Sequence, residues 1–218
     1  MQDMISMGHF SIFLGSVTLA AWVAWISFDK DRGLTYWAAA LASLAVVYGF
    51  LSLRIPLSPI FSVVLANVAL ACTLALVAEC VVCWQSRQSL HGLIWLPVLV
   101  AALGFWGWLD NPQGRIMFGA GVFAIQSLLI LVLLLQKRKQ LRSTGFFLVE
   151  LTAALAACLF VLRAAFTLSG RKDVVPLVVS DQIQASTLLL FLVSVMLLTM
   201  GFELLGGSVR EDDATTGV

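Results

Sequence analysis

The sequence predicts an all-α integral membrane protein, a bundle of seven transmembrane helices with its N-terminus outside and its C-terminus in the cytoplasm. Composition is the first reason. Of 218 residues, 61% are hydrophobic and only 11% are charged, whereas soluble domains carry about 25% charged residues. So few charges cannot make a water-facing surface, and the chain must therefore be solvated by lipid. The apolar runs and the distribution of basic residues are the other two reasons.

Apolar runs of roughly 20 residues can cross a bilayer as helices. The chain has seven, at residues 9–28, 34–54, 58–84, 91–109, 115–136, 144–169 and 183–206. Residues 1–8 are then a short outer N-terminus, residues 9–206 form one membrane domain, and residues 207–218 are a cytoplasmic tail. This start of the chain lacks the basic region and cleavage site of a signal peptide, so the first run is predicted to be a retained helix.

Turn and charged residues separate the runs. The charged turn DKDR lies between the first and second runs, and RIPLSP with its two prolines leads into the third. The fourth run is the least typical, because it is short and contains Pro97 and several glycines. LDNPQG leads into the fifth, QKRKQLR into the sixth, and the longest connection, RKDVVPLVVSDQ, precedes the seventh.

The orientation follows from the basic residues, which are more frequent on the cytoplasmic side of membrane proteins. With seven spans, eight of them share a side with the C-terminus: Lys30, Arg32, Arg87, Lys137, Arg138, Lys139, Arg142 and Arg210. Four lie on the other side: Arg54, Arg115, Arg171 and Lys172. This asymmetry predicts that the N-terminus is outside.

Arg163 is an unusual residue, because it lies inside the apolar stretch AALAACLFVLRAAFTLSG. It is about six residues, or roughly 9 Å, from the outer end of its span. Its side chain could extend to the headgroups as an interfacial anchor. Alternatively it faces the bundle interior and holds a carboxylate or phosphate. Glu150 cannot be its partner, because it lies about 20 Å away along the helix axis.

The second interpretation of Arg163 predicts a ligand site near the outer side of the bundle. Its residues would be Arg163, Arg115, Asn67, Gln126 and Asp181. Arg115 opens the fifth run on the same side, and Asp181 is the best internal counter-ion. Asn67 and Gln126 lie near the middle of their spans, where amides usually form hydrogen bonds between helices. Glu79, Glu150 and Glu203 fall near cytoplasmic ends and are expected at the interface or paired with the basic loops.

Several classes of function are disfavoured. No lysine lies in a span, so a retinal Schiff base is not expected, and His9 and His91 lie on opposite faces, so they cannot hold one haem. Cys80 and Cys83 have redox-motif spacing, but on an apolar helix this favours packing. No zinc cluster, catalytic triad or nucleic-acid-binding tract is present. The sequence therefore predicts no cofactor, no nucleic-acid partner and no enzymatic activity.

The order of these features resembles the N-terminal seven-helix sensory module of bacterial signalling proteins that carry a GGDEF diguanylate cyclase domain. The similarity rests on four stretches: GFLSLRIPLSPIFSVVLANVALACTLAL, GWLDNPQGRIMFGAGVFAIQSLLILVLLL, LFVLRAAFTL and LLTMGFELL. It covers about residues 9–206, and the matching polar positions are Asn67, Arg115 and Arg163. Only about fifteen residues follow Glu203, so the resemblance does not imply cyclase activity for this chain.

The resemblance implies a sensor or receptor in the bacterial cytoplasmic (inner) membrane. Such a module would bind a small anionic or amphipathic ligand at its outer side and act on a separate cytoplasmic signalling enzyme; the bilayer is its other partner, and a homodimer is an open alternative. A ligand can shift helices only if it binds one arrangement better than another. Two other functions stay open: a small transporter or channel, and a membrane anchor subunit of a larger complex.

Overall fold

The computed structural model describes residues 2–27, 32–52, 60–85, 91–136, 144–168 and 193–204, and these ranges form helices and short turns, without a strand. The all-α class is therefore confirmed. The elements are α1 (Gln2–Ser27), α2 (Arg32–Ser52), the π-helix η1 (Ile60–Leu65), α3 (Ala66–Trp84), α4 (His91–Gly107), α5 (Pro112–Gln136) and α6 (Thr144–Leu168). A further helix at Val193–Leu204 is called the last helix here.

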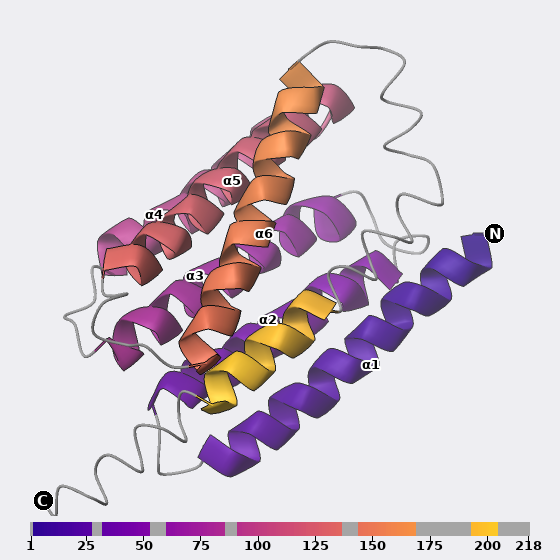
Figure 1. The fold of residues 1–218 in the computed structure, drawn as a ribbon. Helices are drawn as coiled ribbons and strands as arrows, with labels where there is room; N and C mark the ends of the chain where they lie inside the picture. The colour runs from indigo at the N-terminus through magenta and orange to yellow at the C-terminus, as the bar shows by residue number, and fades with distance from the viewer. Residues whose placement is uncertain are drawn as a thin grey trace, which may run out of the picture.

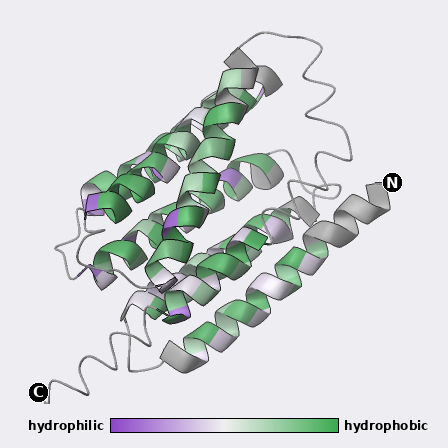
Figure 2. Ribbon diagram, in the orientation of Figure 1, coloured by the Kyte–Doolittle hydropathy of each residue, from purple (hydrophilic) through white to green (hydrophobic). Residues whose placement is uncertain are grey.

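Four helices are long and apolar enough to cross a bilayer, at Gly33–Phe50, Val63–Trp84, Gly114–Gln136 and Thr144–Leu162. The outer surface of the other helices carries large apolar side chains too: Trp25 of α1 is 83% exposed and Leu103 of α4 is 78% exposed. Figure 2 shows apolar residues along most of the described helices, with few and isolated hydrophilic ones. Such a surface is suited to lipid and not to water, so the chain is a membrane protein. That the three shorter apolar helices also span the bilayer stays a prediction.

Two helices have features that the apolar runs do not show. α1 begins at Gln2, whereas the predicted first span begins at residue 9. α4 runs without a break from His91 to Gly107 although it contains Pro97, as membrane helices often do. Of the run expected at 183–206, the structure describes the last helix only.

The helices pack side by side in an order that largely follows the sequence (Figure 1). α1 packs on α2, α2 on α3, α3 on both α4 and α5, and α5 on α4 and α6. The last helix lies between α6 and α2. α3 is therefore central, and its buried alanines, Ala71 and Ala75 among them, let its neighbours approach closely.

Local sequence explains how individual helices are formed. On α2, Leu34, Trp37, Leu41 and Leu44 are buried at a spacing of three and four residues, so they form one stripe that faces the core. At the start of α5, Asn111 Oδ1 accepts a hydrogen bond from the Gly114 amide at 2.9 Å. Asn111 is thus the N-cap and Pro112 the first helical residue, a common way to begin a helix.

Candidate functional site

The ends of several helices meet on one side of the bundle, which we call the His91 end. Here α3, α5 and the last helix finish, and α2, α4 and α6 begin. Gln85 Nε2, directly after α3, donates to the Leu133 carbonyl near the end of α5 at 2.8 Å. The opposite side, where α4 finishes and α5 begins, is called the Arg115 end.

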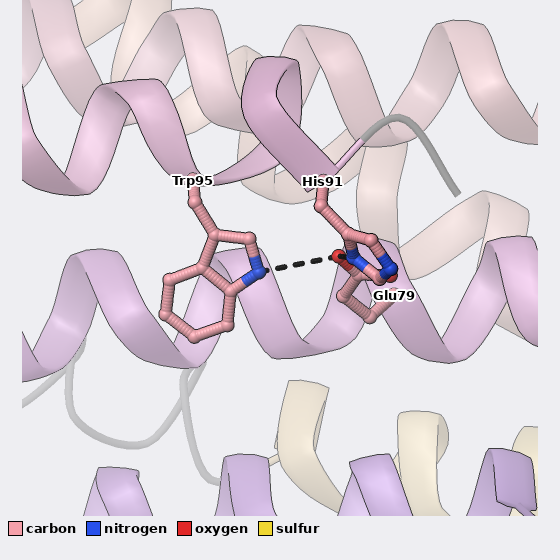
Figure 3. Close-up of polar contacts among 3 residues, drawn as sticks. All are labelled: Glu79, His91 and Trp95. Carbon is pink, nitrogen blue, oxygen red and sulfur yellow. Dashed lines mark hydrogen bonds and ion pairs between the residues drawn. The ribbon is translucent and has the colours of Figure 1, made fainter.

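Glu79, His91 and Trp95 form a polar cluster there (Figure 3). His91 Nδ1 lies 2.6 Å from Glu79 Oε1, and Trp95 Nε1 donates to the same oxygen at 3.2 Å. The Glu79 side chain is only 3% exposed, whereas that of His91 is 65% exposed. The cluster therefore joins a carboxylate inside the bundle to an imidazole at its surface.

The two donors come from one face of α4, because His91 and Trp95 are one helical turn apart. Glu79 lies in the last two turns of α3, which packs against α4. A buried carboxylate is stable only if donors or a positive charge compensate for the water that it has lost. Trp95 Nε1 supplies one such donor and His91 Nδ1 contacts the same oxygen, so the cluster joins the start of α4 to the end of α3.

A second cluster, which we call the aromatic contact, lies on another side of α3. Phe202 of the last helix is fully buried between Trp37 of α2 and Trp84 of α3. Its ring centroid lies 5.0 Å from that of Trp37 and 4.6 Å from that of Trp84. The Trp84 indole also covers Gly33, where a Cβ atom would come within 2.6 Å of the ring.

The two clusters share the end of α3. Glu79 and Trp84 are five residues apart, which is about 140° around a helix, so they point to different neighbours. Between them, Cys80 Sγ donates to the Gly33 carbonyl at 3.1 Å, which supports the packing interpretation of this cysteine. α2, α4 and the last helix therefore all contact α3 within its last two turns.

Of the residues of the expected outer-side pocket, the structure describes the side chains of Arg115, Asn67 and Gln126, and each donates a hydrogen bond to a different backbone carbonyl. Arg115 Nη1 donates to the Leu109 carbonyl at 3.1 Å and so stabilises the turn between α4 and α5. Asp181 lies outside the described residues. The helical backbone of α6 includes Arg163, but its side chain lies outside them too, so the choice between anchor and pocket stays a prediction.

The two mid-span amides, Asn67 and Gln126, form different kinds of hydrogen bond, one within a helical segment and one between helices. Asn67 Nδ2 donates to the Val63 carbonyl of its own helical segment at 2.7 Å. Gln126, which is buried, donates from Nε2 to the Ala71 carbonyl of α3 at 3.0 Å, as expected for an amide between helices. Its Oε1 atom has no hydrogen-bond partner among the described residues. Because Ala71 is one turn after Asn67, the two amides lie at similar depth.

Sequence reasoning missed the pairing of Glu79 with His91 and Trp95 of α4. One signal could have indicated this pairing. His91 is at the start of an apolar run with a tryptophan one turn later, and both side chains can donate to a carboxylate. The described residues contain no group of three or more metal-ligating side chains.

No family model, no curated protein and no solved structure matches this chain. The resemblance to the sensory module of GGDEF proteins therefore stays a prediction, and the function must be argued from the geometry.

Proposed function

We propose that the chain is a bacterial inner-membrane sensor or receptor module. It spans the membrane seven times with its N-terminus outside, binds a small ligand near its outer side and relays a helix shift to a cytoplasmic signalling partner. The observation that carries this proposal is the burial of Phe202 between Trp37 and Trp84. The last helix, from which the chain continues to the C-terminus, is thereby packed against α2 and α3.

A second contact supports the relay. A Cβ atom on Gly201 would lie 2.8 Å from Val149 Cγ2 and 3.0 Å from the Gly145 carbonyl oxygen. The last helix therefore approaches the backbone of α6 as closely as a glycine permits. A shift of α6 relative to α3 must displace the last helix, because packed helices do not deform continuously.

A small transporter is the second candidate, and buried polar atoms in the middle of α5 favour it. Gln126 Oε1 and Ser127 Oγ are both buried without a hydrogen-bond partner among the described residues, and a transport path needs such groups. Against it, the Asn67 amide and the Thr73 hydroxyl on α3 donate to carbonyls of their own helix. These groups do not line a continuous polar path, so the sensor is the better proposal.

Two measurements on the purified chain separate these functions. Sodium octanoate, a carboxylate with an apolar tail, serves as the probe, and inorganic phosphate is the control anion without a tail. A sensor with an outer-side pocket should show a higher unfolding midpoint with octanoate than with phosphate, and no octanoate flux in liposomes. Flux above that of protein-free liposomes would support the transporter. No shift with octanoate would count against the pocket.

Cysteine labelling in intact cells tests the orientation. A cysteine introduced at Gln140 should be protected from an impermeant reagent, and one at Val178 should react. The wild-type chain, which has four cysteines of its own, gives the background. The reverse pattern would show that the orientation is wrong, and two reactive positions would show that the number of spans is wrong.

A further inference from the structure

The start of the third membrane segment has a different backbone from the rest of it. Residues Ile60–Leu65 form the π-helix η1, and the regular helix α3 follows from Ala66 to Trp84. Backbone hydrogen bonds join residues five apart in a π-helix and four apart in an α-helix, so a π-helical turn holds about one residue more. π-helical turns are rare, and a distorted turn in a helix has an identifiable cause.

The side chain of Asn67 supplies such a cause. Its Nδ2 atom donates to the Val63 carbonyl, four residues earlier and inside η1, at 2.7 Å. In a regular α-helix this carbonyl would accept the backbone N–H of residue 67, so the side chain and the backbone of Asn67 compete for one acceptor. A side chain that enters the ladder of backbone bonds in this way distorts the turn. No water inside a bilayer can replace the carbonyl as an acceptor, which favours a lasting bond.

Threonines make the same kind of bond without a π-helical turn. Thr73 Oγ1 donates to the Ala69 carbonyl, also four residues earlier, at 3.0 Å, and α3 is a regular helix there. The threonine hydroxyl is attached directly to Cβ, and α-helices accommodate its bond to this carbonyl. The amide nitrogen of asparagine is one bond further from the backbone and carries two hydrogens. Thr73 is therefore the matched comparison for Asn67.

We propose that the side chain of Asn67 holds η1 in the π-helical form, and that η1 changes to an α-helix when this bond is lost. The change removes about one residue from the turn, so the residues before it rotate by about 100° and move by about 1.5 Å along the axis relative to α3. η1 packs on both α4 and α2, and these contacts are exchanged in the rotation. The inference does not depend on the proposed sensor function, because it follows from backbone hydrogen bonding.

The first experiment observes the Asn67 amide directly. Asn67 and Asn111 are the two asparagines of the chain. The Asn111→Ser variant keeps a helix-capping residue type and leaves Asn67 as the sole asparagine. After labelling with ¹⁵N-asparagine in detergent micelles, one side-chain proton of Asn67 should lie downfield of its free-amide position and exchange slowly with solvent. Two rapidly exchanging protons at free-amide positions would overturn the proposal.

The second experiment measures the rotation with pairs of spin labels, in a background without the native cysteines. One label is placed at residue 60, the first of η1, and the other at Leu103 of α4, which is mostly exposed. In Asn67→Leu this distance should change by several ångströms from that of the parent. The reference pair joins Leu103 to Leu65, whose φ of −65° and ψ of −38° are already α-helical. The reference distance should stay the same.

Two further variants keep the test decisive. Thr73→Val removes the matched bond within regular α3 and should leave both distances unchanged. Asn67→Thr offers the Val63 carbonyl a hydroxyl of the kind that α3 accommodates at Thr73, so it should give the same rotation as Asn67→Leu and decides the question if that variant does not fold. Unchanged distances in the folded Asn67 variants would overturn the proposal, and so would an equal change in Thr73→Val.

Discussion

The polar and aromatic side chains at the two ends of the bundle make contacts over different sequence separations. At the Arg115 end, the hydrogen bonds among the described residues that close the connection between α4 and α5 are local: Arg115 donates to the Leu109 carbonyl, and Asn111 accepts from the Gly114 amide. At the His91 end, the contacts join helices that are far apart in the sequence. Phe202 lies against Trp37 and Trp84, and Gln85 donates to Leu133.

The two ends differ in how many helices their described contacts join. The hydrogen bonds at the Arg115 end close the connection between α4 and α5, whereas the contacts at the His91 end join the end of α3 to α2, α4, α5 and the last helix. In the relay proposed above, the His91 end would therefore pass a change to several helices, because they all contact α3. The ligand site predicted from the sequence includes Arg115 and so lies at the Arg115 end. In the relay proposed above, a shift caused by the ligand would therefore have to travel along the full length of the helices to the His91 end.

Phe202→Ala should have the largest effect on stability. It removes a fully buried ring from the contact between three helices, and such changes typically lower the free energy of unfolding by about 3 to 5 kcal/mol. Phe147→Ala is the matched control, because Phe147 of α6 is 56% exposed and faces the lipid side. Unfolding in detergent measures both variants. Equal losses would mean that the aromatic contact does not hold the last helix.

Gly201→Ala should have the second largest effect. The added methyl group would meet the Gly145 carbonyl oxygen and Val149, and overpacking of this kind lowers stability by about 1 to 3 kcal/mol. At Gly121 of α5, an added Cβ atom meets nothing within 4 Å, so Gly121→Ala should be neutral or slightly stabilising. The same unfolding measurement compares them. A neutral Gly201→Ala would show that the last helix can move away from α6 without loss.

The all-α class and the membrane location could be predicted from the sequence, because a membrane helix requires a long apolar run. Asn111 and Pro112 also carry a clear helix-start signal, and the structure uses them in that way. The helix α1 extends beyond the predicted span at residues 9–28, because hydropathy marks where apolar residues begin and not where helical backbone hydrogen bonds begin. Gln2 to Gly8 are more polar than the following residues but still helical.

The contacts at the His91 end could not be predicted in the same way. Which side chains meet depends on how each helix is rotated about its axis, and a helix that is apolar on all faces gives little information on this rotation. Phe202 is one of 14 phenylalanines in the chain, and nothing in its local sequence distinguishes it. Glu79 could be recognised as unusual, but its partner is twelve residues away across a helix connection.

The two mid-span amides should have smaller effects than the residues above. Gln126→Leu removes a hydrogen bond between α5 and α3, and such bonds contribute about 0.6 to 2 kcal/mol in membranes. Asn67→Leu removes a bond within one helical segment, so its loss should be about 1 kcal/mol or less. Both variants are measured by unfolding in detergent. A larger loss for Asn67→Leu than for Gln126→Leu would indicate a contact of Asn67 with another helix.

A change in stability as small as those of the mid-span amides is expected for Arg115→Gln, which gives the sharpest test of the Arg115 end. Its one described side-chain hydrogen bond, to the Leu109 carbonyl, should be worth about 0.5 to 1.5 kcal/mol. If this end also holds the proposed ligand, Arg115→Gln and Arg163→Leu should both remove the octanoate shift of the unfolding midpoint while the chain stays folded.

Arg163→Lys distinguishes the two interpretations of that residue. Lysine keeps the charge but lacks the planar fork that pairs with a carboxylate, so a pocket residue should lose most of the octanoate shift on this substitution. An interfacial anchor should tolerate it, because lysine also extends to the headgroups. If both Arg163→Lys and Arg115→Gln keep the full octanoate shift, neither arginine binds the ligand. Arg115 would then only stabilise the turn between α4 and α5, Arg163 would be an interfacial anchor, and the ligand site would have to lie elsewhere in the bundle.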